Sequence, residues 1–149
     1  MKTSSTPIFV MVCSVFVMVC CVFCVAMKPK RLTREQCRNL LDAIVAVESG
    51  GRIDAVGDRG KAIGPLQIHK IYWIDAVSYD KTLAPPDYKY EDCKNLEYAE
   101  KIVVAYWNMW ASKNASWEEL ARVHNGGPKG FTNIKTMPYW VKVKGEMYK

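Results

Sequence analysis

The sequence has few cysteines outside one segment, and this limits how the chain can be cross-linked. Four of the six cysteines lie in the apolar run Ile8–Met27, so only Cys37 and Cys93 remain in the rest of the chain. These two do not have metal-ligand spacing, and we therefore expect neither a metal nor another cofactor. If the chain is exported, one disulfide between Cys37 and Cys93 is expected.

Motifs for nucleic-acid binding are also missing. Beyond residue 30 there is no internal repeat, no low-complexity tract, no arginine-rich helix and no aromatic nucleic-acid motif, which argues against a nucleic-acid partner. The formal net charge is +6, and it is +5 without residues 1–26, which hold one lysine and no acidic residue. A basic exported domain is attracted to anionic bacterial surfaces, lipids or acidic polysaccharide, although the same charge also serves solubility alone.

The N-terminal apolar run is open to two interpretations. It contains no charge and one hydroxyl side chain, and basic residues follow it. A signal peptide cleaved after Ala26 fits this pattern, but the run is also long enough to span a bilayer, and its basic flank would then favour a cytoplasmic C-terminus. A membrane contact is expected only through residues 8–27, and only if they are retained. We expect a signal peptide or signal anchor over 1–26, a short basic linker over 27–33 and one folded domain over 34–149, secreted or membrane-anchored outside the cytoplasm.

Helical spacing dominates the remaining sequence. A capping-box pattern begins at Thr33, and apolar residues then recur at helical spacing until Ser49-Gly50-Gly51 ends the helix. Glycines among short apolar pairs over 52–68 predict a loop or small hairpin. The fold class predicted is α+β, mainly α, with a small β-hairpin between the first helix and the others. Further helices are expected over 69–79, 90–112, 116–125 and 136–148.

Glu48 is the acidic residue whose position is most informative. It ends the first predicted helix on the same face as Leu41 and Ile44, so its carboxyl is expected to face the core or a cleft. Burial and the partial negative charge of a helix C-terminus both raise a carboxyl pKa, as a general acid near neutral pH requires. The alternative is an ordinary solvated glutamate in the last turn.

Three motifs occur in an order that resembles lysozyme-like proteins. They are AVESGG at Ala46–Gly51, GPLQI at Gly64–Ile68 and HNGG at His124–Gly127. This order is similar to that of invertebrate-type lysozymes and soluble lytic transglycosylases, and it implies a lysozyme-like fold over residues 34–148. Further stretches resemble the invertebrate-type family specifically: Ile71–Asp75, Ala121–Pro128, and Tyr139-Trp140 followed by Lys142-Val143.

The resemblance implies cleavage of the β-1,4 bond between N-acetylmuramic acid and N-acetylglucosamine in peptidoglycan, with Glu48 as the general acid. The family's second acid falls most naturally on Asp58, as nucleophile or electrostatic partner, with Asp54 as its rival. Asp58 is otherwise a turn-forming residue beside glycines. Aromatic residues at helical spacing are alternatively core, and His124 a helix cap. Residues implied to bind glycan are Gln67, Ile68, Tyr72, Tyr106, His124, Asn125 and Gly126.

The domain departs from the family in its cysteines. Invertebrate-type lysozymes are usually rich in disulfides, whereas two cysteines remain here, so the fold must depend more on its helical core. Other functions stay open beside the muramidase: a lytic transglycosylase that uses Glu48 alone, a non-catalytic cationic glycan-binding or antimicrobial protein, and a membrane-anchored wall-remodelling factor. No residue constellation matches the isopeptidase activity credited to some relatives.

Overall fold

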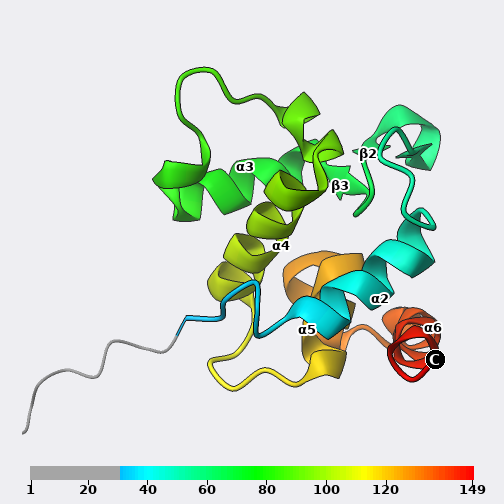
Figure 1. Ribbon diagram of the computed structural model, residues 1–149. Coiled ribbons are helices and arrows are strands. Elements are labelled where there is room, and N and C mark those ends of the chain that lie inside the picture. The colour runs from blue at the N-terminus through cyan, green and yellow to red at the C-terminus, as the bar shows by residue number, and fades with distance from the viewer. Residues whose placement is uncertain (1–30) are drawn as a thin grey trace, which may run out of the picture. The chain divides into compact units, whose positions relative to one another are not determined.

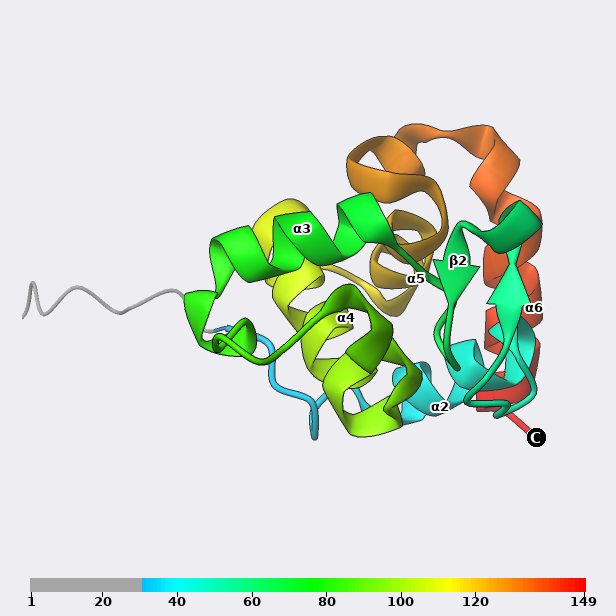
Figure 2. The same cartoon turned by 90° about the horizontal axis from the view of Figure 1, so that it is seen from above.

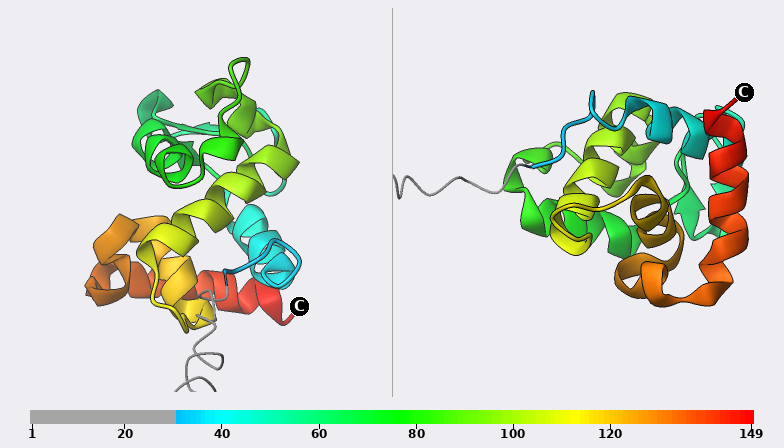
Figure 3. Two further views of the ribbon diagram at one scale, coloured as in Figure 1. Left: turned by 90° about the vertical axis from the view of Figure 1, so that its left-hand side faces the viewer. Right: turned by 90° about the horizontal axis from the view of Figure 1, so that it is seen from below.

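Helix α4 (Leu96–Trp110) runs through the middle of residues 31–149, the part of the chain that the computed structural model describes (Figure 1). Nine of its residues are buried, among them Ile102, Val103 and Trp107. The helix is apolar on more than one face because other elements cover it on several sides. The small sheet and α3 (Lys70–Tyr79) lie towards one end of α4, and α2 (Arg38–Glu48), α5 (Trp117–Gly126) and α6 (Met137–Met147) lie towards the other (Figure 3).

The sheet and short 3-10 helices connect these parts. Seen from above, α3 lies beside α4, and the sheet is found where α3 begins (Figure 2). The strands are β1 (Val56–Gly57), β2 (Ala62–Ile63) and β3 (Ile68–His69), and the 3-10 helices are η1 (Asp58–Gly60), η2 (Lys81–Leu83), η3 (Tyr90–Lys94), η4 (Gly127–Thr132) and η5 (Ile134–Thr136).

Local capping explains where the helices begin. Thr33 and Gln36 exchange side-chain-to-backbone hydrogen bonds of 3.1 and 3.3 Å, but they cap a turn, and α2 itself starts at Arg38. The longest helix starts six residues later than expected, since the Asn95 side chain accepts from the backbone N–H of Tyr98 and so caps α4. Ser116 caps α5 in the same way, as the sequence predicts.

The sheet is antiparallel with the order β1-β2-β3. Gly57 pairs with Ala62, which in turn pairs with His69. Directly opposed residues of neighbouring strands project to the same face, so this row determines what the sheet presents to the rest of the protein. The small β element was predicted as a hairpin of two strands, but the sheet has three.

Both cysteines of the domain are buried free thiols, so the expected disulfide is not present in the structure. Cys37 lies at the start of α2, whereas Cys93 lies in η3. Both side chains belong to the hydrophobic core. Burial raises the pKa of Cys37 to about 11 and that of Cys93 to about 12.

The predicted signal peptide or anchor lies outside the described residues. Among residues 31–149, no helix has the length and apolar character needed to cross a membrane.

Candidate active site

Glu48 lies in a cavity of about 200 Å³ to which several parts of the chain contribute. The helix C-terminus of α2, the turn at η1, the sheet and the end of α5 all provide side chains. The lining residues are Glu48, Asp58, Ala62, Gln67, His69, Tyr72, His124 and Asn125. Six of these eight residues are predicted site residues. The other two, Ala62 and His69, were not predicted from the sequence.

Ser49 holds the end of α2 in place beside the second motif. Its hydroxyl donates to the carbonyl of Pro65 at 2.9 Å and accepts from the backbone N–H of Gly51. The glycines after it have positive φ, 61° at Gly50 and 86° at Gly51, which lets the chain reverse directly after the helix. The AVESGG and GPLQI motifs are therefore joined through one hydroxyl, and Glu48 is held next to the sheet.

The electrostatic surroundings of Glu48 correct the expectation from the sequence. Burial raises its pKa, but His124, Tyr139 and His69 outweigh burial and hold the pKa of Glu48 below its ordinary value. Nε2 of His124 lies 3.6 Å from Oε1 of Glu48, slightly beyond a hydrogen bond. The expectation of a raised pKa is wrong for the free protein, because it considered only burial and the helix terminus.

Tyr139 on α6 is a site residue that the sequence analysis did not assign to the cleft. Burial and the nearby Glu48 carboxylate hold the pKa of Tyr139 well above its ordinary value, so its hydroxyl keeps its proton. Within the described part of the chain this hydroxyl has no partner at hydrogen-bond distance. It therefore acts on Glu48 as a nearby dipole. Only its place in a motif that resembles the family could have pointed to it.

Asp58 is held in an unusual backbone conformation beside a histidine. Its φ is 46° and that of Arg59 is 56°, both in the left-handed region that residues with a Cβ rarely adopt. Such conformations cost roughly 1–3 kcal/mol and are found where the surrounding structure enforces them, often at functional sites. Oδ2 of Asp58 lies 3.5 Å from Nε2 of His69.

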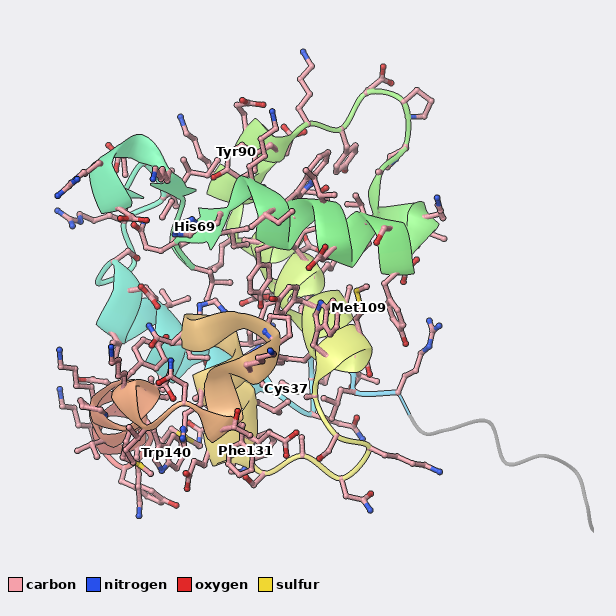
Figure 4. All side chains as sticks on the ribbon, turned by 180° about the vertical axis from the view of Figure 1, so that it is seen from behind. Cys37, His69, Tyr90, Met109, Phe131 and Trp140 are labelled. Atoms are coloured by element: carbon pink, nitrogen blue, oxygen red, sulfur yellow. The ribbon has the colours of Figure 1, made fainter. Side chains whose placement is uncertain are left out.

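His69 could have been found only from the strand register. It is at the end of β3 and at the start of α3, next to the sheet (Figure 4). It pairs with Ala62, and both residues line the cavity. His69 caps no backbone group of α3, so its ring stays available in the cavity.

Gln67 lines the cavity, but its amide nitrogen already has partners. Nε2 donates to the carbonyl of Gly64 at 2.8 Å and to that of Ala55 at 3.2 Å. Its φ of 47° is also in the left-handed region. The Gln67 side chain packs so closely against Gly57 that a Cβ there would lie 2.1 Å from its oxygen. Gln67 thus stabilises the sheet and leaves mainly its oxygen for a ligand.

Four other candidates lie away from the cavity lining. Ile68 is fully buried, and its carbonyl accepts from the Tyr90 hydroxyl at 2.7 Å. Tyr106 is 3% exposed and belongs to the core. Gly126 packs against Thr136, where a Cβ would lie 2.6 Å from the threonine methyl. Asp54, the rival of Asp58, is exposed and does not line the cavity.

A larger depression of about 490 Å³ lies elsewhere, between the η2–η3 segment and the start of α4. Asp87, Tyr88 and Lys101 are among its lining residues, and none of the three shared motifs contributes to it. Within residues 31–149 no group of three or more potential ligands could hold a metal ion. We therefore take the smaller cavity with its two carboxylates as the candidate active site.

A mainly helical domain with a three-stranded sheet, and with two acidic side chains in one cavity beside that sheet, defines a protein of the lysozyme class. The chain belongs to the Destabilase family, whose model matches residues 21–145. This match includes all three shared motifs and every residue that lines the cavity.

Two of the curated relatives of this chain illustrate the similarity to lysozymes. Lysozyme 1 of Crassostrea virginica is 34% identical over 121 residues, which cover 77% of this chain and 60% of that protein. The lysozyme of Ostrea edulis is 35% identical over 101 residues, which cover 65% of this chain and 66% of that protein. The matched part of the chain thus spans less than two thirds of the length of either relative.

Two crystal structures have a similar fold. One contains Aeromonas hydrophila PliI in complex with Meretrix lusoria lysozyme, with a TM-score of 0.60, 28% identity, and coverage of 72% of this chain and 88% of the matched chain. The other is Tapes japonica lysozyme, with a TM-score of 0.59, 28% identity, and coverage of 72% and 87%. The mainly helical α+β fold with its small sheet is thus confirmed.

Proposed function

We propose that this protein is a muramidase that cleaves the β-1,4 bond between N-acetylmuramic acid and N-acetylglucosamine in peptidoglycan. The observation that carries the proposal is the presence of Glu48 and Asp58 in one cavity at the edge of the small sheet. Membership of the Destabilase family and similarity to lysozymes of several molluscs support the same activity.

Glu48 is the proton donor in this proposal. Its carboxyl protonates the glycosidic oxygen as the bond to that oxygen breaks, which prevents an alkoxide from leaving. The side chain is 19% exposed in the free protein, so one face remains accessible to glycan. A bound sugar would cover that face, and the additional burial would raise the pKa of Glu48 towards the range in which a general acid is useful.

Asp58 is the second carboxylate of the mechanism. It faces the oxocarbenium-like transition state as nucleophile or electrostatic partner, because a carboxylate on that side stabilises positive charge on the sugar ring. Its side chain is 58% exposed and therefore accessible from solvent. Nε2 of His69 lies 3.5 Å from this carboxylate and helps to hold it in place. Asp58 distinguishes hydrolysis from a transglycosylase reaction, which would need Glu48 alone.

Asn125 and Gln67 are the cavity residues that bind the glycan in this proposal. The exposed side chain of Asn125 and the free oxygen of Gln67 are suited to hydrogen bonds with N-acetyl groups. The net charge of +6 attracts the protein to anionic bacterial walls, where a secreted or externally anchored enzyme would meet its substrate.

Product analysis tests this proposal. Purified Gram-positive peptidoglycan is digested with the wild-type protein and with the Glu48→Gln variant, and the fragments are analysed by mass spectrometry. We expect reducing N-acetylmuramic acid ends with the wild type and none with the variant. Anhydro-muramic ends would show a lytic transglycosylase, and equal killing of bacteria by both proteins without any fragments would show a non-catalytic antimicrobial protein.

A further inference from the structure

Tyr72 has a buried position that does not fit a sugar-binding platform. Its ring is 7% exposed and stacks on Tyr106, with ring centroids 3.6 Å apart and planes inclined by 13°. A ring covered on one face by another aromatic core residue offers little surface to a glycan. Its hydroxyl, however, reaches the cavity wall, where it lies 3.2 Å from Nδ1 of His124 in a buried contact.

The two contacts of His124 place its ring between Tyr72 and the general acid. Nδ1 faces the hydroxyl of Tyr72, and Nε2 faces Oε1 of Glu48 at 3.6 Å. The rings of Tyr72 and His124 meet edge to face, at 72° and 5.5 Å between centroids. Three side chains from α3, α5 and α2 thus form a line that ends at Glu48. The contact between Tyr72 and His124 is buried.

The hydroxyl of Tyr72 has Nδ1 of His124 as its hydrogen-bond partner, and its own proton is satisfied when it donates to that nitrogen. Burial holds the pKa of Tyr72 well above its ordinary value, so the phenol keeps its proton. A neutral imidazole that accepts this proton at Nδ1 must carry its own hydrogen on Nε2. The Nε2–H group then points at Glu48, and a donor in this place stabilises the carboxylate form.

We propose that Tyr72 is a positioning residue for the reaction at Glu48, and that it acts through His124 by fixing the tautomer whose Nε2–H faces the carboxylate. Tyr72 itself touches neither the glycan nor the reacting atoms. This inference rests on the proposed function, because it assumes that Glu48 donates the proton.

Other groups around Glu48 do not replace this contact. Tyr139 approaches from α6, His69 from β3 and Asp58 from η1. The ring of Tyr139 is 6.4 Å from that of His124 between centroids, and no described side chain other than Tyr72 contacts Nδ1. At Nδ1, the tautomer of His124 is therefore influenced from α3, while Glu48 on α2 faces Nε2.

The pH profile of kcat/KM tests the proposal. In Tyr72→Phe the Nδ1–H tautomer becomes accessible, and its Nε2 lone pair accepts from protonated Glu48, so the pKa of Glu48 rises. We expect the limb on which activity falls with increasing pH to move upward by about half a pH unit. Tyr79→Phe is the matched control, because it removes the same atom from the same helix without a contact to His124. An unchanged profile in Tyr72→Phe, or an equal shift in both variants, would overturn the proposal.

A second measurement does not depend on activity or on a variant. The chain has two histidines, so ¹⁵N NMR of the full chain can assign both imidazoles. We expect His124 of the wild-type protein, when neutral, to be in the Nε2–H form, and a dominant Nδ1–H form would overturn the proposal. Glu48→Gln separates the two hypotheses. If that variant retains peptidoglycan cleavage, the proposed function fails. If the variant is inactive but His124 of the wild-type protein is in the Nδ1–H form, only the role of Tyr72 is contradicted.

Discussion

At the scale of single residues, opposing interactions act on the pKa of Glu48, and in the free protein those that lower it are stronger. Burial favours its neutral form, while His124 and Tyr139 favour the charged form and prevail. A general acid must be protonated when the bond breaks, so the enzyme has to gain the neutral form when substrate binds. Covering Glu48 with glycan supplies this change, because it strengthens burial and removes water.

The pH dependence of catalysis should show this change. Since the pKa of Glu48 is lowered in the free protein, kcat/KM should fall as the pH rises through that lowered pKa, and activity should be greatest on the acidic side. The corresponding limb of kcat reports the enzyme–substrate complex, so we expect it at higher pH. Steady-state kinetics on soluble glycan fragments from pH 3 to pH 8 would measure both limbs. Limbs that coincide would contradict this account of how Glu48 is protonated.

Asp58 and Asp54 provide a matched pair of variants. Asp58 lines the cavity, whereas Asp54, four residues earlier, is exposed outside it. Asp58→Asn should lower kcat by about a hundredfold or more, because it removes the charge that faces the transition state. Asp54→Asn should stay within about twofold of the wild type, since surface substitutions rarely matter. A large loss of activity in Asp54→Asn with an active Asp58→Asn would show that Asp54, and not Asp58, is the second carboxylate.

At the scale of elements, the glycines of the motifs differ in what they do. Gly64 has a φ of 76°, and a Cβ on it would lie 2.2 Å from the carbonyl oxygen of Cys93. This glycine lets the turn before β3 pack against η3. Gly51 has a φ of 86° but nothing within 4 Å of the position of a Cβ. One glycine is thus required for packing as well as conformation, and the other for conformation alone.

Alanine substitutions at these two glycines should therefore have unequal effects on stability. Gly64→Ala should lower the free energy of unfolding by about 2–4 kcal/mol, because backbone strain and a steric clash add together. Gly51→Ala should lower it by about 1 kcal/mol, from strain alone. Urea unfolding of the two variants would measure the difference, and equal effects would show that the contact of Gly64 with η3 is not significant.

Helix positions were largely predictable from the sequence because their signals are local. The expected helices over 69–79 and 136–148 agree closely with α3 and α6, as do the stop after Glu48 and the cap at Ser116. Two helix starts were wrong: α2 starts at Arg38 and not at the Thr33 capping box, and the expected longest helix extended across η3 because Asn95 was not recognised as the cap of α4. Elements whose ends depend on side-chain caps are thus predictable only where the cap is identified.

The cavity was less predictable, because its composition depends on tertiary packing. Glu48 and Asp58 were named from motifs, but the contact of Asp58 with His69 depends on the register between β2 and β3. Helical spacing gives the side of α3 on which Tyr72 lies, but the packing of α3 decides which residue it meets. Its hydrogen bond to His124 could therefore not be predicted from the spacing. Spacing identifies a face of an element, whereas only the fold identifies its neighbour.

At the scale of the whole molecule, residues 31–149 are held together by packing and by ion pairs, without a disulfide. Glu100 on α4 is 2% exposed and accepts hydrogen bonds from both terminal nitrogens of Arg38 at the start of α2. The Arg38 side chain is 44% exposed but the Glu100 carboxylate is buried, so loss of Arg38 would leave a buried charge less well compensated. This pair, with the apolar core around α4, joins α2 to α4.

The thiol groups offer a direct check of this description. Cys37 and Cys93 are fully buried, and burial raises the pKa of each to about 11 and about 12. Because the thiolate is the reactive form, we expect neither to react with iodoacetamide in the native protein at pH 8, and both to react after unfolding without a reductant. Peptide mass mapping would locate the label. Labelling of both only after reduction would show that they form a disulfide.

The central claim, that Glu48 donates the proton which cleaves the glycan, is tested most directly by comparing Glu48→Gln with the wild type. Clearance of a suspension of purified Gram-positive walls would give the rate, and sedimentation with the same walls would give binding. We predict a loss of clearance of at least about a hundredfold, the usual contribution of general acid catalysis, with wall binding unchanged. Clearance by Glu48→Gln at a rate close to that of the wild type would contradict the claim.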